Sequence, residues 1–271
     1  MAFEARTGCS RCVTDFQADL AALLSRAERD RVPVPPLTAH ADLDSADAYG
    51  IQAINTSRRL AAGERIAGHK VGLTSRAMQQ QLGVDEPDFG VILEAMLIAD
   101  GGPLDLDELI APRIEAEIAF RLGADLEGAV TDDQVRTAVA EVFLALEVID
   151  SRIADWKITL PDTVADNASS ARMVAGRPIR ATPELLAALP EIAVSLSEDG
   201  HTVAAGTGAA VLGDPIRAVT WLVRRLAGFG GSLRAGDLVL AGAVHASAPL
   251  TRGTRVAAQA TGFSTVEVRV R

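Results

Sequence analysis

The chain has 271 residues, of which 48% are hydrophobic and 23% are charged, as in a globular protein with a sizeable core. Its 36 acidic residues outnumber its 26 basic ones, and the formal net charge of −10 argues against nucleic acid or an anionic membrane as a partner. Aromatic residues make up only 4%, too few for a base-stacking surface. The sequence contains neither an apolar signal core nor a run of about 18 apolar residues, so we expect a cytoplasmic protein.

The only two cysteines, Cys9 and Cys12, form a Cys-x-x-Cys pair near the N-terminus. A structural zinc site normally has four ligands, and a redox pair lies beside a βαβ unit. The surrounding sequence offers neither context. We therefore interpret these residues as two free thiols.

Two helices are expected near the N-terminus. The first begins after Thr14 and runs to about residue 29, with leucines along one stripe, and a proline-rich break follows at 32–36. Ser45 can cap the second helix, which runs over about 46–62 and ends at Gly63. Together they predict a small helical arm over residues 1–64.

Residues 65–271 change to short strands, glycine-rich turns and brief helices, which predicts one β-rich domain without regular βαβ alternation. A turn-rich loop is expected at 86–90, and a long functional loop at 151–174. Asp199 and Gly200 fit a hairpin turn, and Asp214 followed by Pro215 fits a helix start. The expected strands are 65–73, 112–120, 142–149, 192–196, 201–204, 238–241, 255–260 and 265–270, and the expected helices are 75–82, 132–140 and 215–227.

Three glutamates are the main candidates for chemistry. Glu115 and Glu117 alternate with apolar residues, which predicts a strand with both carboxylates on one face. Glu147 interrupts an apolar run, where an ionised carboxylate needs a partner charge or a metal. Oxygen ligands of this kind suit Mg²⁺, Mn²⁺ or Ca²⁺. The alternatives are a solvated strand face, or ion pairs with Arg113 or Arg152.

Other polar residues are weaker candidates. Lys70 lies between glycines at the end of a strand, where it could anchor an anion or transfer a proton, although a lysine taken alone is more often a surface residue. Asp88 could belong to a functional site, but it could equally be a residue that favours a turn. His69 and His245 lie beside candidate residues and are given no role. The long loop adds hydrogen-bonding residues that could instead cap the loop: Asn167, Ser169 and Ser170.

Five motifs occur together and in order: Gly-His-Lys-Val-Gly-Leu-Thr-Ser (68–75), Gln-Leu-Gly-Val-Asp-Glu-Pro-Asp-Phe-Gly (81–90), Pro-Arg-Ile-Glu-Ala-Glu-Ile-Ala-Phe (112–120), Ala-Leu-Glu-Val-Ile-Asp-Ser-Arg-Ile (145–153) and Asp-Thr-Val-Ala-Asp-Asn-Ala-Ser-Ser (162–170). This set resembles the 2-oxopent-4-enoate (2-hydroxypenta-2,4-dienoate) hydratase family and its sister family, the 4-oxalocrotonate decarboxylases. Both belong to the fumarylacetoacetate hydrolase superfamily. The resemblance covers the chain beyond about Asp42.

The resemblance implies a mixed, β-rich α/β fold of the fumarylacetoacetase type, with sheets around a metal site and a small N-terminal helical region. It implies Mg²⁺ or Mn²⁺ held by the same three glutamates, and Lys70 and Asp88 as groups that handle protons and orient water. Four positions are implied as substrate-binding: Leu93, Asn167, Ser170 and Arg172. The resemblance also implies a homo-oligomer and a role in aromatic catabolism. The two sister enzymes of the family can associate.

The implied reaction begins with ketonisation of a 2-hydroxy-2,4-dienoate and ends with addition of water at C4, through an enolate stabilised by the metal. Asp88 favours the hydratase branch, whereas Asn-Ala-Ser-Ser-Ala-Arg (167–172) is close to the decarboxylase sequence, in which Arg172 could bind an additional substrate carboxylate. His245 departs from the small residues expected in both branches. Less favoured alternatives are an acylpyruvate hydrolase and a non-catalytic partner subunit.

Overall fold

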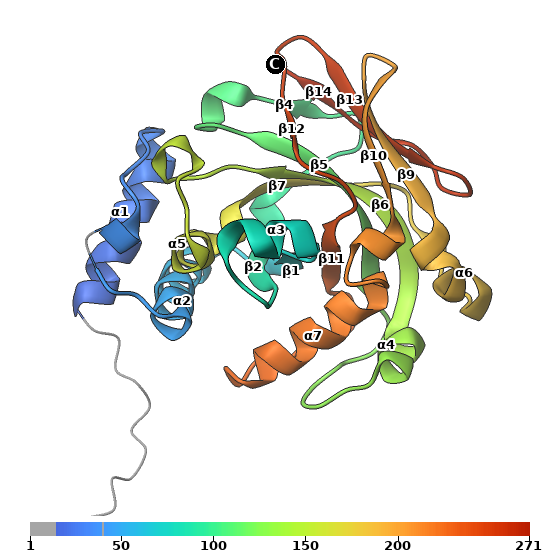
Figure 1. Ribbon diagram of the computed structural model, residues 1–271, viewed down its shortest axis with the longest axis horizontal. Coiled ribbons are helices and arrows are strands. Elements are labelled where there is room, and N and C mark those ends of the chain that lie inside the picture. Colours follow the sequence, from blue (N-terminus) through green and yellow to red (C-terminus); the bar gives the residue numbers. More distant parts are fainter. Residues whose placement is uncertain (1–14, 40) are drawn as a thin grey trace, which may run out of the picture.

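A curved nine-stranded sheet forms the centre of the described residues, which are 15–39 and 41–271 of this computed structural model (Figure 1). Its main path runs through β2 (Asp88–Leu93), β1 (Ile66–Gly72), β11 (Leu238–Ala243), β5 (Arg113–Leu122), β6 (Val139–Ile149), β7 (Ser170–Ala175) and β3 (Leu97–Ile98). Two short strands extend it, because β12 (Ala248–Pro249) pairs with β5 and β8 (Ile179–Arg180) pairs with β6.

A second, five-stranded sheet packs beside the first and has the order β10 (His201–Thr207), β9 (Ala193–Glu198), β13 (Arg255–Ala260), β14 (Val266–Val270) and β4 (Pro103–Leu104). Asp199 and Gly200 join β9 to β10 with φ angles of 48° and 83°, the left-handed pair that a two-residue hairpin turn requires. The hairpin prediction is therefore confirmed. Strands β9, β13 and β14 pack against β5 and β6, so this sheet covers one face of the first.

The helices are α1 (Asp15–Asp30), α2 (Ser45–Ala61), α3 (Arg76–Leu82), α4 (Asp132–Ala138), α5 (Leu160–Ala165), α6 (Pro183–Ala188) and α7 (Pro215–Ala227). Figure 1 shows α1, α2 and α5 grouped at one side of the large sheet, while α7 crosses below it. Among the described helices, none combines the length and the apolar character that crossing a membrane requires.

The two faces of the large sheet have different neighbours. On β5, Ile114, Ile118 and Phe120 are fully buried in the main core, which continues into the second sheet and α7. The residues that alternate with them point to the other face. A smaller apolar cluster fills part of that face: Ile92, Ala119, Phe143, Ala145, Met173, Leu238 and Leu240. The strand alternation predicted for 112–120 is thus confirmed, and Glu115 and Glu117 lie on the same face as this smaller cluster.

Several predicted boundaries differ from the structure. Asp88, Phe89 and Gly90 form the start of β2, because pairing with β1 overrides the local preference for a turn. The expected long loop at 151–174 contains α5 and most of β7. Asp44 rather than Ser45 caps α2, and it accepts the N–H of Asp47 at 2.8 Å in a capping box. Thr14, Cys9 and Cys12 lie outside the described residues.

Candidate metal and catalytic site

Three glutamates converge on the face of the large sheet that carries the smaller apolar cluster. Strands β5 and β6 are antiparallel neighbours, and their register places Glu115 directly opposite Glu147, with Glu117 two residues further along the same face. One carboxylate oxygen from each glutamate lies within 4.8 Å of the other two. Glu117 is 1% exposed and Glu147 is fully buried, so little water is present to screen the repulsion between these carboxylates. The structure therefore brings together the three glutamates that the sequence analysis selected.

The electrostatics of this cluster favour a bound cation. Neither oxygen of Glu147 has a hydrogen-bond partner within residues 15–39 and 41–271. Burial, and then the charge of Glu147, raises the pKa of Glu115 to about 7. The pKa of Glu117 is raised well above its ordinary value by burial and by the other two carboxylates. An all-oxygen set with unneutralised negative charge is the donor set that a hard divalent cation takes, so the residues fit such an ion.

Lys70 and Asp88 border the three glutamates from β1 and β2. The Lys70 Nζ lies 3.5 Å from the Glu147 Oε2. Burial by itself lowers the pKa of Lys70, but the carboxylates of Glu147 and Asp88 raise it by a larger amount. The pKa therefore lies above its ordinary value, and the side chain is charged. Burial raises the pKa of Asp88, and Lys70 partly offsets this effect. A buried ammonium group and a buried carboxyl group therefore lie side by side next to the glutamates.

Gly72 creates the space for Asp88, which it faces across the β1–β2 ladder. A Cβ atom at Gly72 would lie 2.2 Å from the Asp88 Oδ1 and 3.1 Å from the Lys70 Nζ. Only glycine therefore leaves the carboxylate where it is.

An irregularity in β11 directs a backbone N–H at the cluster. The register of β11 against β5 shifts between Leu240 and Ala243, and Gly242 has φ +117°. The N–H of Gly242 donates to the Glu117 Oε2 at 2.8 Å. Such bulges commonly re-aim groups beside active sites.

His245 lies in the segment between β11 and β12. Its Nε2 accepts the N–H of Ala116 at 3.4 Å, and its Nδ1 lies 2.9 Å from the carbonyl oxygen of Ala246. The proton therefore lies on Nδ1, and burial lowers the pKa of the ring. His245 thus contacts the backbone between two of the glutamates as a neutral side chain.

The arginines named as alternative partners bind elsewhere. Arg113 donates to the Ser247 Oγ at 2.6 Å, and the Arg152 Nε donates to the Asp166 Oδ1 at 2.5 Å. Lys70 supplies the ion pair to Glu147 instead.

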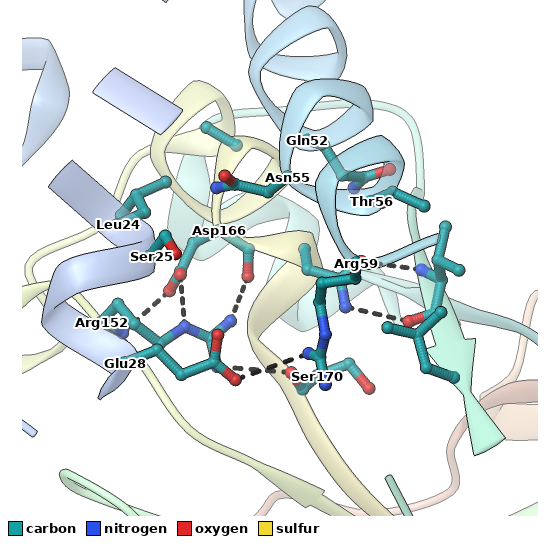
Figure 2. A pocket seen from close by; sticks show the side chains of 14 residues that line it. Leu24, Ser25, Glu28, Gln52, Asn55, Thr56, Arg59, Arg152, Asp166 and Ser170 are labelled. Atoms are coloured by element: carbon teal, nitrogen blue, oxygen red, sulfur yellow. Dashed lines mark hydrogen bonds and ion pairs between the residues drawn. The ribbon is translucent and has the colours of Figure 1, made fainter. Parts of the chain in front are cut away.

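The predicted substrate-binding residues fall into two places. Leu93, Asn167 and Ser170 line a small pocket where β2 and the start of β7 meet beneath α1 and α2 (Figure 2). Arg172 faces Val148 in the β6–β7 register, so it points to the opposite side of the sheet from Glu147. There it pairs with Glu108 at 3.1 Å.

Sequence reasoning missed two polar residues of α2. Tyr49 and Gln52 are 5% and 4% exposed, and both hydrogen bond to the backbone of Phe89, the residue after Asp88. The available signal was a glutamine on the buried stripe of an amphipathic helix, one turn after Ala48. A buried glutamine needs partners for its amide, which points to a specific contact.

Residues 61–271 match the family model described as fumarylacetoacetate (FAA) hydrolase C-terminal, and the chain belongs to this family. A 2-keto-4-pentenoate hydratase of Paraburkholderia xenovorans is 47% identical over 224 residues, which are 82% of each chain. A protein of the same name from Burkholderia vietnamiensis is 43% identical over 92% of this chain and 95% of its own. The predicted family is confirmed.

Solved structures agree with this assignment. The 4-oxalocrotonate decarboxylase of Pseudomonas putida G7, complexed with calcium and acetate, superposes with a TM-score of 0.89 at 34% identity, over 97% of this chain and 100% of its own. The same protein was also solved with magnesium and adipate. The fold is therefore of the fumarylacetoacetate hydrolase type, as predicted, with mixed β-sheets and N-terminal helices.

Proposed function

We propose that this protein is a metal-dependent hydratase that converts a 2-hydroxy-2,4-dienoate into a 4-hydroxy-2-oxo acid. The observation that carries the proposal is the cluster of three glutamates, two of them buried, with the buried Lys70 and Asp88 beside them. The hydratases that resemble this chain over most of its length support the same reaction.

A divalent cation is supported by the oxygen-only ligands, and we propose Mg²⁺ as the physiological ion. Glu115, Glu117 and Glu147 would hold it. When bound, it would supply Lewis-acid stabilisation of negative charge that develops on the 2-oxo oxygen of the substrate.

The protein's own residues handle the protons. Ketonisation removes the proton of the 2-hydroxyl group and adds one at C5, which leaves a C3–C4 double bond conjugated with the 2-oxo group. Hydration then places a hydroxyl on C4 and a proton on C3. In this proposal the charged Lys70 donates a proton to the carbon chain, and Asp88 orients the attacking water and accepts its proton.

A substrate comparison tests this proposal. With Mg²⁺, the purified protein is expected to bleach the ultraviolet absorbance of 2-hydroxypenta-2,4-dienoate and to form 4-hydroxy-2-oxopentanoate. Lys70→Met should abolish turnover, whereas Lys157→Met, which replaces an exposed lysine paired with Asp155, should not. Absence of the hydrated product with active metal-loaded protein would refute the proposal.

Decarboxylation is the second candidate, because the decarboxylase structure superposes over nearly the whole chain. It predicts release of CO₂ from 4-oxalocrotonate at a rate above that of hydration. The position of Arg172 away from the glutamates gives no support to an extra carboxylate site at this cluster. Measurement of both rates on one preparation decides between the branches.

Assembly and location are also proposals. The family resemblance supports a homo-oligomer in the cytoplasm that can associate with a sister enzyme of the pathway. Sedimentation velocity of the purified chain, alone and with such a decarboxylase, would test both associations.

A further inference from the structure

The outer edge of β2 is hydrogen bonded by side chains. β2 ends the main path of the large sheet, so among residues 15–39 and 41–271 only β1 pairs with it along the ladder. On the other side, the N–H of Phe89 donates to the Tyr49 Oη at 3.3 Å, and its carbonyl accepts the Gln52 Nε2 at 2.9 Å. The N–H of Val91 donates to the Asn167 Oδ1 at 2.8 Å, and its carbonyl accepts the Asn167 Nδ2 at 2.9 Å.

These four bonds reproduce what a neighbouring strand would provide. An exposed strand edge is normally hydrated or shielded, but Phe89 and Val91 are buried, so their backbone groups need partners from the protein. Three side chains supply them. We call Tyr49, Gln52 and Asn167 the side-chain strand.

Gln52 ties this edge to a second element. Its Nε2 also donates to the carbonyl of Val164 in α5, at 3.0 Å. α5 leads directly into residues 167–169, which carry Asn167. Figure 2 shows Gln52 on α2, on the same side as Asn55, Thr56 and Arg59, above Asp166 and Arg152.

The position of the side-chain strand relates it to Asp88. Asp88 is the first residue of β2 and immediately precedes Phe89, whose N–H and carbonyl are both held. The ring of Tyr49 also stacks on that of Phe89, with centroids 4.5 Å apart. These contacts to Phe89 therefore fix the position of the beginning of β2 next to β1, where Gly72 leaves just enough space for the Asp88 carboxylate.

We propose that Tyr49, Gln52 and Asn167 are positioning residues that set Asp88 against Lys70 for the hydration step. The inference rests on the proposed function for its catalytic consequence. It assigns Asn167 to the backbone of β2 instead of to the substrate, since both ends of its amide are already engaged there.

Kinetics of Gln52→Met test the catalytic part. Methionine has a side chain of similar length to glutamine but no donor for the carbonyls of Phe89 and Val164. We expect kcat to fall about 10- to 100-fold, as for a misplacement of about 1 Å, while KM and the dissociation constant of Mg²⁺ change less than about twofold. Ser197→Ala is the matched control, because it removes a buried bond to the carbonyl of Ala257 in the other sheet. Full kcat in Gln52→Met would overturn the proposal, as would an equal loss in the control.

Asn167→Asp separates positioning from substrate contact. Aspartate tolerates the left-handed backbone of Asn167, whose φ is 56°, but cannot donate to the carbonyl of Val91. We expect a fall in kcat with little change in KM. A rise in KM with unchanged kcat would place Asn167 on the substrate and refute its assignment.

Hydrogen exchange tests the side-chain strand without any activity measurement. In Tyr49→Phe, amide exchange in a peptide covering residues 88–93 should accelerate about tenfold, because the acceptor of the Phe89 N–H is gone. A peptide from β13 should be unchanged. Unaltered exchange at β2 would overturn the inference. A wild-type protein without hydratase activity, but with this exchange pattern, would refute the proposed function and leave the side-chain strand standing.

Discussion

The carboxylate of Glu117 accepts the N–H of Gly242, a bond that a glutamine oxygen can keep. Glu117→Gln therefore removes one negative charge with little change in shape. We expect Mg²⁺ to bind at least about tenfold more weakly and to raise the melting temperature less than in the wild type. Without metal, the variant should melt no lower than the wild type, because repulsion with Glu115 and Glu147 is reduced.

Glu141→Gln provides the control for this experiment. Glu141 lies on the same strand as Glu147 but pairs with Arg121 at the surface. Its replacement should leave the metal-induced rise in melting temperature intact. A Glu117→Gln protein that keeps the full rise would contradict the ligand assignment.

His69 makes stability depend on pH. Burial lowers the pKa of its ring from 6.5 to about 4, so the native protein holds it neutral where the unfolded chain takes up a proton. The free energy of unfolding should therefore fall as pH drops from about 6.5 to about 4, by up to about 3 kcal/mol from this residue. Urea unfolding at about pH 7.5 and about pH 5 should show a smaller pH effect in His69→Leu. An equal pH effect in both proteins would exclude His69 as its source.

The three glutamates were predictable from sequence because strand alternation and an isolated charge in an apolar run are local patterns. The partners of Phe89 were not. Tyr49 and Gln52 lie about 40 residues before Phe89 in the sequence. Nothing in the sequence of α2 indicates which distant backbone segment packs against that helix. Residues whose role depends on tertiary hydrogen bonds to backbone leave no motif of their own.

At the scale of elements, the facing ends of β1 and β2 determine the space around Asp88. Gly72→Ala would place a methyl group 2.2 Å from the Asp88 Oδ1, so the carboxylate must move. We expect kcat to fall about 100-fold or more while Mg²⁺ affinity changes little, since the glutamates lie on β5 and β6. Steady-state kinetics and calorimetric metal titration measure the two effects.

Gly231→Ala is the control for added bulk. A Cβ atom there would meet its nearest neighbour at 3.4 Å, an ordinary contact. Activity should be retained. If Gly72→Ala were as active as this control, the space around Asp88 would not limit the reaction.

Element predictions succeeded where local signals agree with the fold. Asp214 and Pro215 begin α7 as the sequence indicates, with the Asp214 side chain accepting the N–H of Ile216. They failed where distant contacts dominate. α5 lies within residues 151–174, which the sequence predicts as a loop, yet its Asp162 is fully buried.

At the scale of the whole molecule, Asp162 joins the N-terminal arm to the rest of the chain. Its carboxylate accepts the N–H and hydroxyl of Thr38 at 3.1 and 2.8 Å, and both corresponding groups of Thr159 at 2.9 and 2.7 Å. A second link is Val34, whose backbone bonds to that of Arg152 and Ala154. The predicted boundary at residue 64 is therefore crossed by buried contacts.

Asp162→Ala should destabilise the entire chain because it leaves four donors without their acceptor. We expect the free energy of unfolding to fall by about 3 kcal/mol or more. Urea unfolding followed by tryptophan fluorescence and by far-ultraviolet circular dichroism should give coincident transitions. Two separate transitions, with only one shifted, would show that the arm is an independent unit.

The pairing of β1 with β11 has a consequence for synthesis on the ribosome. Gly68, His69 and Lys70 pair with residues 238–240, so the large sheet cannot be completed until the last part of the chain has emerged. β5 and β6 can pair much earlier, which brings the glutamates together before β1, which carries Lys70, can pair with β11. During that interval the nascent chain exposes the unpaired edges of β1 and β5, which is the kind of surface that makes incompletely folded chains prone to aggregation.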